Sequence, residues 1–206
     1  MRTVHLSALF ACAVAAGLAL AAEPPATPPH AHETMAPAQS IAGESIYQLD
    51  LELTTADGRE RPLAQLRGRP VLITMFYASC DSVCPLLAFN LQRMERALTP
   101  AERARLQVVM VSFDPQRDTP TALTRFAELH NIDTSKWWLA RAPEDKVREL
   151  AAVLGIRYRE AQPGIFSHSA VVTLLDAGGL IVDRTANLQS IDPGFQQALR
   201  RTLAQP

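Results

Sequence analysis

Residues 71–85 read VLITMFYASCDSVCP. The first seven form a continuous apolar run rich in strand formers, which is typical of a central strand covered on both faces. The run ends as the chain reaches Cys80, and leucine and methionine then recur at helical spacing over residues 86–98. The stretch predicts a buried strand that feeds directly into a helix, with Cys80 and Cys84 at the junction.

Strand and helix patterns alternate on both sides of this stretch. Alternating apolar residues from Ile46 to Leu53 predict a half-buried strand before it. Capping patterns at Thr99 and Thr119 each predict the start of a helix. The other expected elements are strands at residues 106–113, 137–140, 171–175 and 180–184 and helices at residues 143–154 and 193–203. This order predicts an α/β sandwich with helices on both faces of a mixed sheet.

Composition limits the class of protein. The chain has 206 residues, of which 48% are hydrophobic and 20% charged, enough for one globular domain or at most two small ones. This excludes disorder throughout and a multi-span membrane protein. The formal net charge is −1, so no whole-chain field would gather nucleic acid, and we expect no nucleic-acid partner.

Residues 1–21 have the anatomy of an export signal. Arg2 precedes a long Ala/Leu/Val-rich run that ends in Ala19-Leu20-Ala21, a small-x-small cleavage pattern. Two alternatives stay open: an uncleaved membrane anchor, and a lipoprotein signal with Cys12 as the modified residue. Each of them predicts an exported protein, either periplasmic or anchored to the inner membrane and facing the periplasm.

Residues 22–45 are rich in Pro, Ala, Thr and His and predict a semi-rigid linker ahead of a domain at residues 46–204. His30, His32 and Met35 in this linker are donors that copper accepts. The alternative is a purely polar linker.

Cys80 and Cys84 lie four residues apart where a helix is expected to begin, so both sulfur atoms can point toward one spot. Helix N-termini favour anions and lower thiol pKa, which helps both metal binding and disulfide exchange. The alternative is two buried cysteines that act as small hydrophobic residues. Their spacing has three intervening residues instead of the two of thioredoxin-type enzymes, and Tyr77 stands where a peroxiredoxin would have threonine.

His168 supplies a candidate third ligand. It falls in an expected loop before the strand at residues 171–175, and in a thioredoxin-like layout that loop lies beside the turn that carries the cysteines. Two thiolates and one imidazole are a good donor set for Cu(I) and can also hold Cu(II). A lone histidine in a loop is otherwise a surface or capping residue, so the prediction of a ligand depends on its combination with the two cysteines.

Two acidic residues and two tryptophans have open roles. Asp114 and Asp118 either border the site, orienting His168 or docking a partner, or cap a turn and a helix end. Trp137 and Trp138 are adjacent in an expected strand, so one should face the core and the other solvent.

Three motifs, in order, resemble the Sco/SenC family: Cys80-x-x-x-Cys84-Pro85 after a strand, the run DPQRDTP at residues 114–120, and Phe166-Ser167-His168. The resemblance covers about residues 46–203. It implies a thioredoxin-like three-layer sandwich with a mixed central sheet and an N-terminal β extension. It also implies copper ligation by Cys80, Cys84 and His168, and a reversible disulfide between the two cysteines. Asp81 departs from the family pattern, in which many members have proline.

The resemblance further implies a copper chaperone of cytochrome c oxidase assembly, which would deliver copper to the CuA site of subunit II. Other copper chaperones or thioredoxin-like reductants would be further partners. The alternative hypotheses are a periplasmic thiol-disulfide oxidoreductase, in which one cysteine attacks and the other resolves, and a copper or redox sensor. All three use the same dithiol.

Overall fold

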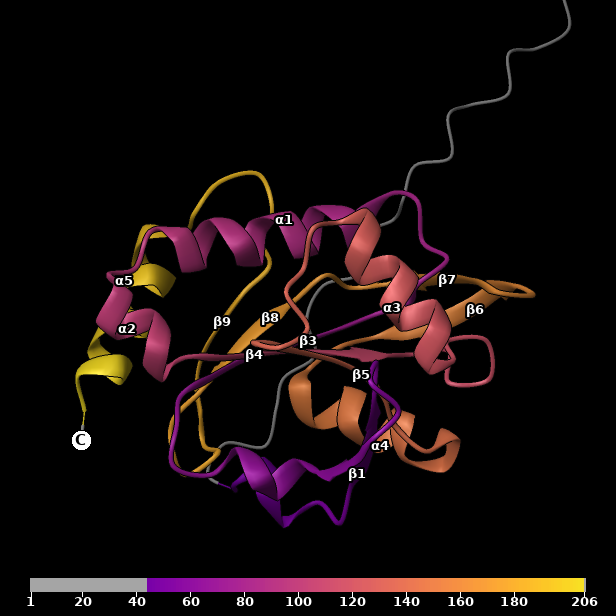
Figure 1. Ribbon diagram of the computed structural model, residues 1–206, viewed down its shortest axis with the longest axis horizontal. Coiled ribbons are helices and arrows are strands. Elements are labelled where there is room, and N and C mark those ends of the chain that lie inside the picture. The colour runs from indigo at the N-terminus through magenta and orange to yellow at the C-terminus, as the bar shows by residue number, and fades with distance from the viewer. Residues whose placement is uncertain (1–43, 206) are drawn as a thin grey trace, which may run out of the picture. The chain divides into compact units, whose positions relative to one another are not determined.

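A seven-stranded mixed sheet organises residues 44–205, the part of the chain that the computed structural model describes (Figure 1). Its strand order is β2-β1-β5-β4-β3-β8-β9. The strands are β1 (Glu52–Thr55), β2 (Glu60–Pro62), β3 (Val71–Phe76), β4 (Gln107–Ser112), β5 (Trp137–Arg141), β8 (Val172–Leu175) and β9 (Ile181–Thr185). The three central strands β3, β4 and β5 run parallel, and the other pairings are antiparallel. The predicted mixed α/β fold is confirmed, with the β1–β2 hairpin as the N-terminal extension at one edge.

The helices begin and end where local signals predict. They are α1 (Val83–Arg96), α2 (Pro100–Arg105), α3 (Pro120–Leu129), α4 (Glu144–Leu154) and α5 (Pro193–Ala204). Thr99 and Glu102 form a reciprocal capping box at α2, and the Thr119 side chain accepts from Ala122 N at α3. Gly155 ends α4 in the left-handed conformation with φ 72°, which glycine adopts without steric cost.

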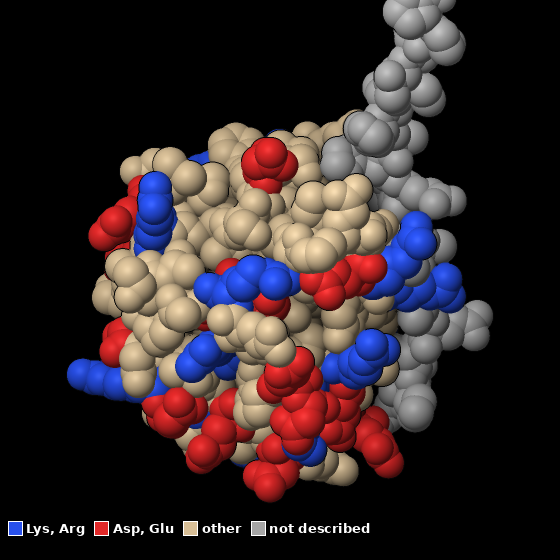
Figure 2. Space-filling view, turned by 90° about the vertical axis from the view of Figure 1, so that its right-hand side faces the viewer, with Lys and Arg blue, Asp and Glu red and all other residues tan. Residues whose placement is uncertain are grey.

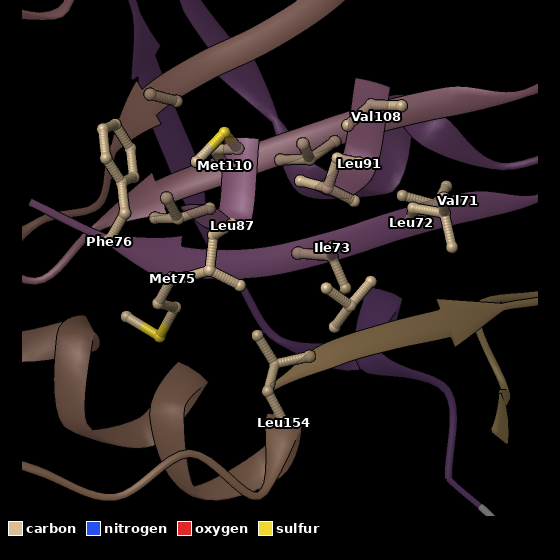
Figure 3. Packing of buried hydrophobic residues seen from close by; sticks show 14 of the residues in the cluster. Val71, Leu72, Ile73, Met75, Phe76, Leu87, Leu91, Val108, Met110 and Leu154 are labelled. Carbon is tan, nitrogen blue, oxygen red and sulfur yellow. The ribbon is translucent and has the colours of Figure 1, made fainter. Parts of the chain in front are cut away.

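The helices cover both faces of the sheet. Figure 1 shows α1 and α3 above it and α4 below. Every residue of β3 is buried, which explains why its sequence lacks the alternation of a half-exposed strand. Leu87 and Leu91 of α1 and Leu154 of α4 belong to the same core around β3 and β4 (Figure 3). The apolar run of residues 71–77 therefore lies in the middle of the core, and Cys80 follows shortly after the end of this run.

Residues 46–48 differ from the expected strand. They form a 3-10 turn, η1 (Ile46–Gln48), and the strand is confined to β1; a second turn, η2 (Leu63–Leu66), follows β2. Ile46 and Tyr47 are both buried, although consecutive residues of a half-exposed strand would alternate. Ile46 N donates to the carbonyl oxygen of Gly179, and the Tyr47 ring occupies the space beside Gly179 where a Cβ would lie. This tertiary contact overrides the local alternation.

A second, two-stranded sheet lies outside the main one. It pairs β6 (Tyr158–Gln162) with β7 (Ile165–His168) in antiparallel register. The predicted loop position of His168 is wrong, because His168 is the last residue of β7. The sequence does not predict this hairpin, because most of its residues are polar and exposed and show no apolar period. Pro163-Gly164 is the one local signal for it, as a dipeptide that marks turns.

Figure 2 shows the face that carries α3 and this hairpin. Acidic side chains gather along its lower part, where α4 lies, and uncharged residues dominate its upper part. This face therefore presents two regions of different charge to any partner.

The predictions for the N-terminal region fall outside the described residues, except for residues 44 and 45 at the end of the linker. They comprise the signal or anchor at residues 1–21 with Cys12, and the linker at residues 22–45 with its donors His30, His32 and Met35. The boundaries of these segments, and those of the domain at residues 46–204, stay predictions. Among the helices of residues 44–205, none is both apolar enough and long enough to span a membrane.

Candidate metal centre

The two cysteines occupy the turn between β3 and α1. Cys80 N donates to the carbonyl oxygen of Tyr77, and Cys84 lies in the first turn of α1. The N-cap residue Ser82 makes no side-chain cap hydrogen bond; instead, Cys84 N donates to Cys80 Sγ at 3.4 Å. Cys80 sulfur thus takes the place of a capping acceptor, where the positive end of the helix favours a thiolate.

His168 reaches the cysteines from the end of β7. Its Nε2 atom lies 3.7 Å from Cys84 Sγ, and its Nδ1 atom lies 3.2 Å from the carbonyl oxygen of Ser169. Because a carbonyl oxygen only accepts, this contact requires a proton on Nδ1, and in the neutral ring the Nε2 lone pair then faces Cys84. A metal-bound histidine is commonly oriented by such a partner for its second nitrogen.

The structure brings all three predicted ligands together. One ligand atom of each of Cys80, Cys84 and His168 lies within 4.8 Å of the others. The three residues are 6%, 0% and 7% exposed, so only small parts of Cys80 and His168 face the solvent. Two metal–ligand bonds of about 2.0–2.3 Å span up to about 4.6 Å, so small side-chain rotations would let one ion contact all three.

Comparison with known proteins identifies the family. The model of the SCO1/SenC family matches residues 39–203. The chain belongs to the SCO1/SenC family.

Its relatives in this family are distant. A mitochondrial SCO2 homolog of Bos taurus is 26% identical over 172 residues, which cover 81% of this chain and 63% of that protein. A SCO1 protein homolog of Bacillus subtilis is 25% identical over 96 residues, 46% of this chain and 49% of that protein. The chain therefore spans less than two thirds of the length of either relative. The structure of Bradyrhizobium japonicum ScoI with copper bound has a TM-score of 0.61 at 22% identity, covering 74% of this chain and 96% of that one, which shows the shared fold.

Aromatic rings surround the histidine of this SCO1/SenC protein. The Phe113 ring lies 4.8 Å from the His168 ring and 4.9 Å from that of Tyr158, centroid to centroid. Tyr77 meets His168 at 6.1 Å and Phe166 at 5.2 Å, both edge to face. These rings hold the imidazole in place and lower the local dielectric. The sequence does not predict Phe113, Tyr77 or Tyr158 as part of the site, because no local pattern shows that they lie near His168.

The electrostatics make the two cysteines unequal. A hydrogen bond from the Cys84 thiol, above all, and one from the Cys84 backbone N–H lower the pKa of Cys80 to about 3. Burial, together with the same Cys80 contact, raises the pKa of Cys84 well above its ordinary value. Burial and the nearby Cys80 charge raise the pKa of Tyr77 to about 12, so the phenol stays neutral. The metal-free dithiol therefore carries one thiolate, on Cys80, and one thiol.

The two aspartates hold the turn after β4. Asp118 Oδ2 accepts from Ala78 N at 2.9 Å and from the Ser112 hydroxyl. Asp114 Oδ2 accepts from Arg117 Nε at 2.6 Å. The ring nitrogens of His168 contact Cys84 and Ser169 instead. Asp114 and Asp118 therefore do not orient His168 directly, and their role is to hold the turn.

The tryptophans alternate as predicted. Trp137 is buried and its indole nitrogen donates to Glu95, whereas Trp138 is half-buried with the Arg61 guanidinium 5.2 Å above its ring. Arg61 therefore covers one face of Trp138.

Proposed function

We propose that this SCO1/SenC protein binds one copper ion through Cys80, Cys84 and His168 and delivers it to cytochrome c oxidase, at the CuA centre of subunit II. The observation that carries the proposal is the convergence of these three ligand atoms within 4.8 Å at a buried, aromatic-lined position. Two sulfur donors favour Cu(I), and the imidazole nitrogen extends the set to Cu(II). The copper in the ScoI structure of similar fold supports the choice of metal.

The unequal cysteines suit the loading of copper as cargo. Cys80 is already a thiolate and can attack a copper ion that another chaperone presents, while Cys84 releases its proton when it binds. Release would follow by ligand exchange, in which thiolates of the target displace Cys80 and Cys84 one at a time. Oxidation of the metal-free pair by the disulfide of an oxidising partner, which takes up the two electrons and the Cys84 thiol proton, removes both sulfur donors and would abolish tight binding. A thioredoxin-like reductant would restore them.

The sequence of residues 1–21 supports a proposal for the place of action. We propose that they direct the domain out of the cytoplasm, as a cleaved signal or as an anchor, so that the copper site faces the periplasm. Fractionation of cells that express the full chain tests this, because the proposal requires the protein in the periplasmic or membrane fraction.

A copper titration of the full chain tests the site. Cu(I), with a competing chelator, and Cu(II) are added separately to the reduced chain and to its disulfide form. We expect one equivalent to bind tightly to the reduced form only. His168→Ala should weaken this binding, and His130→Ala, at the end of α3 and outside the site, should not. A variant with alanine in place of His30, His32 and Met35 distinguishes copper bound by the linker from copper bound at the three-ligand site.

The titration also distinguishes the rival function. If the reduced chain binds neither ion but reduces an oxidised CuA-type dithiol, the protein is a thiol-disulfide oxidoreductase. If His168→Ala binds copper as the unmodified chain does, the proposed ligand set is wrong.

A further inference from the structure

One turn contacts both halves of the metal site. In the turn after β4, Asp118 accepts the backbone N–H of Ala78, two residues before Cys80. Its neighbour Arg117 reaches in the other direction, to the β6–β7 hairpin that ends in His168. The cysteine turn and the histidine hairpin are therefore attached to adjacent residues.

Arg117 joins two carboxylates. Its Nε atom donates to Asp114 Oδ2 at 2.6 Å, and a terminal guanidinium nitrogen donates to Glu160 Oε1 at 2.8 Å. Glu160 Oε1 also accepts from Gly164 N, at 2.8 Å, so the carboxylate ties the guanidinium to the hairpin turn. Gly164 has φ +76°, and a Cβ there would lie 3.1 Å from Arg117 Nε. Glycine at this position allows the left-handed turn and the close approach of Arg117.

The hairpin depends on such contacts. An isolated two-stranded hairpin is marginally stable in water, and β6 is mostly exposed. The Phe113–Tyr158 stack holds the end of the hairpin near His168, because Tyr158 pairs with His168 across the two strands. Arg117 holds the opposite end, near Gly164. The planar guanidinium fork can serve both acids at once, which a lysine could not do with the same geometry.

We infer that Arg117 is a positioning residue for the metal site. By linking Asp114 to Glu160 it fixes the hairpin on the turn after β4, and through the hairpin it fixes His168 Nε2 relative to Cys84 Sγ. The consequence for copper rests on the proposed function; the consequence for the hairpin does not.

Two variants and one matched control test this. Arg117→Gln removes both ion pairs, and Glu160→Gln removes only the charge on the hairpin and leaves the Arg117–Asp114 pair intact. Arg159→Gln is the control, because Arg159 is exposed on the same hairpin, next to Glu160. Amide hydrogen exchange of residues 158–168 is measured in the metal-free full chain. Copper affinity and the sulfur-to-Cu(II) charge-transfer band are measured in the loaded chain.

We expect hairpin exchange to accelerate about two- to fivefold in Arg117→Gln and Glu160→Gln, the effect of losing an ion pair whose two side chains are about half exposed. Copper affinity should fall by a similar factor, because the hairpin carries His168, and the charge-transfer band should shift toward that of His168→Ala. Arg159→Gln should match the unmodified chain. The double variant should lose no more than the larger single loss, because both substitutions break one network.

The outcomes separate the two proposals. If His168→Ala weakens copper binding while Arg117→Gln and Glu160→Gln keep the native exchange rates and band, Arg117 does not position the site and the proposed function stands. If His168→Ala has no effect on copper, the ligand set is wrong, and hairpin exchange alone decides whether Arg117 holds the hairpin. If Arg117→Gln fails to fold, Glu160→Gln decides the question.

Discussion

Cys84 Sγ and His168 Nε2 lie 3.7 Å apart although 84 positions separate the two residues in the chain. The cysteine comes from the junction of a core strand and its helix, and the histidine from a hairpin outside the main sheet. An unfolded chain would offer only the two neighbouring cysteines. Copper that uses all three ligands should therefore stabilise the folded state, because binding and folding are linked.

The low pKa of Cys80 predicts an unusual pH dependence of alkylation. With a pKa of about 3, Cys80 is a thiolate throughout the range above that value, so its rate with iodoacetamide should stay nearly constant from pH 8 to about pH 4. An ordinary thiol of pKa about 8.5 loses roughly tenfold in rate per pH unit over this range. Peptide mapping of the reduced, metal-free chain measures the rate at Cys80. A rate that rises tenfold per unit up to pH 8 would contradict the assignment.

Phe113→Leu should weaken both copper binding and the stability of the fold, whereas a similar substitution elsewhere in the core should weaken the stability alone. The substitution removes the ring contacts with His168 and Tyr158 and should cost about 1–3 kcal/mol of unfolding free energy. Phe126→Leu is the control, since the Phe126 ring packs on Phe76 at 4.8 Å in the core. Urea unfolding should show similar losses for both, and copper titration a loss for Phe113→Leu only. Equal effects on copper would show that the aromatic contacts of His168 are unimportant.

Gly179→Ala should destabilise the domain more than Gly58→Ala. Both glycines have positive φ, 82° and 77°, so alanine at either position costs about 1–2 kcal/mol of backbone strain. Space around Gly58 is open, whereas a Cβ at Gly179 would overlap the Tyr47 ring and add about 1–3 kcal/mol. Thermal or urea unfolding of the two variants measures the difference. Equal losses would mean that the contact between Tyr47 and Gly179 is not tight.

Asp192 should stabilise α5 in a pH-dependent way. Its carboxylate accepts from Gly194 N, Phe195 N and the Thr185 hydroxyl, and the Phe195 bond, above all, lowers its pKa. Since the folded pKa lies below the unfolded value of about 3.9, the contribution is complete above that value and is lost as pH falls through the folded pKa. Asp192→Ala should cost about 1 kcal/mol at pH 7 and Asp192→Asn less, because asparagine also caps helices.

Urea unfolding of these two variants and the unmodified chain, at pH 7 and near pH 3, provides the measurement. The difference between the unmodified chain and Asp192→Ala should shrink at the lower pH. A difference that persists unchanged would show that the carboxylate charge is irrelevant to the cap.

Features that depend on neighbouring residues could be predicted from the sequence. The buried strand at residues 71–76, the capping box at Thr99, the helix stop at Gly155 and the cysteine pair all follow from local patterns. These signals act over a few residues, so one sequence is enough to identify them.

The other features depend on contacts between distant segments. The β6–β7 hairpin has little apolar character of its own, and the rings and ion pairs that hold it come from residues 113–117. The local pattern at Ile46 predicts a strand, whereas the turn found there depends on contact with Gly179, which lies far away in the sequence. The sequence predicts His168 as a ligand, and the structure brings its ring to the two cysteines, but the sequence does not predict its position at the end of a strand.

The group that orients the His168 ring is the main-chain oxygen of Ser169. A carboxylate in that place could be protonated at low pH or lost through a single mutation. A peptide oxygen is not protonated in this way, and a mutation does not remove it, because every residue that could replace Ser169 has a main-chain oxygen. The tautomer that leaves Nε2 free is thus set by the backbone conformation, and a substitution of the side chain at position 169 does not remove the acceptor that selects it.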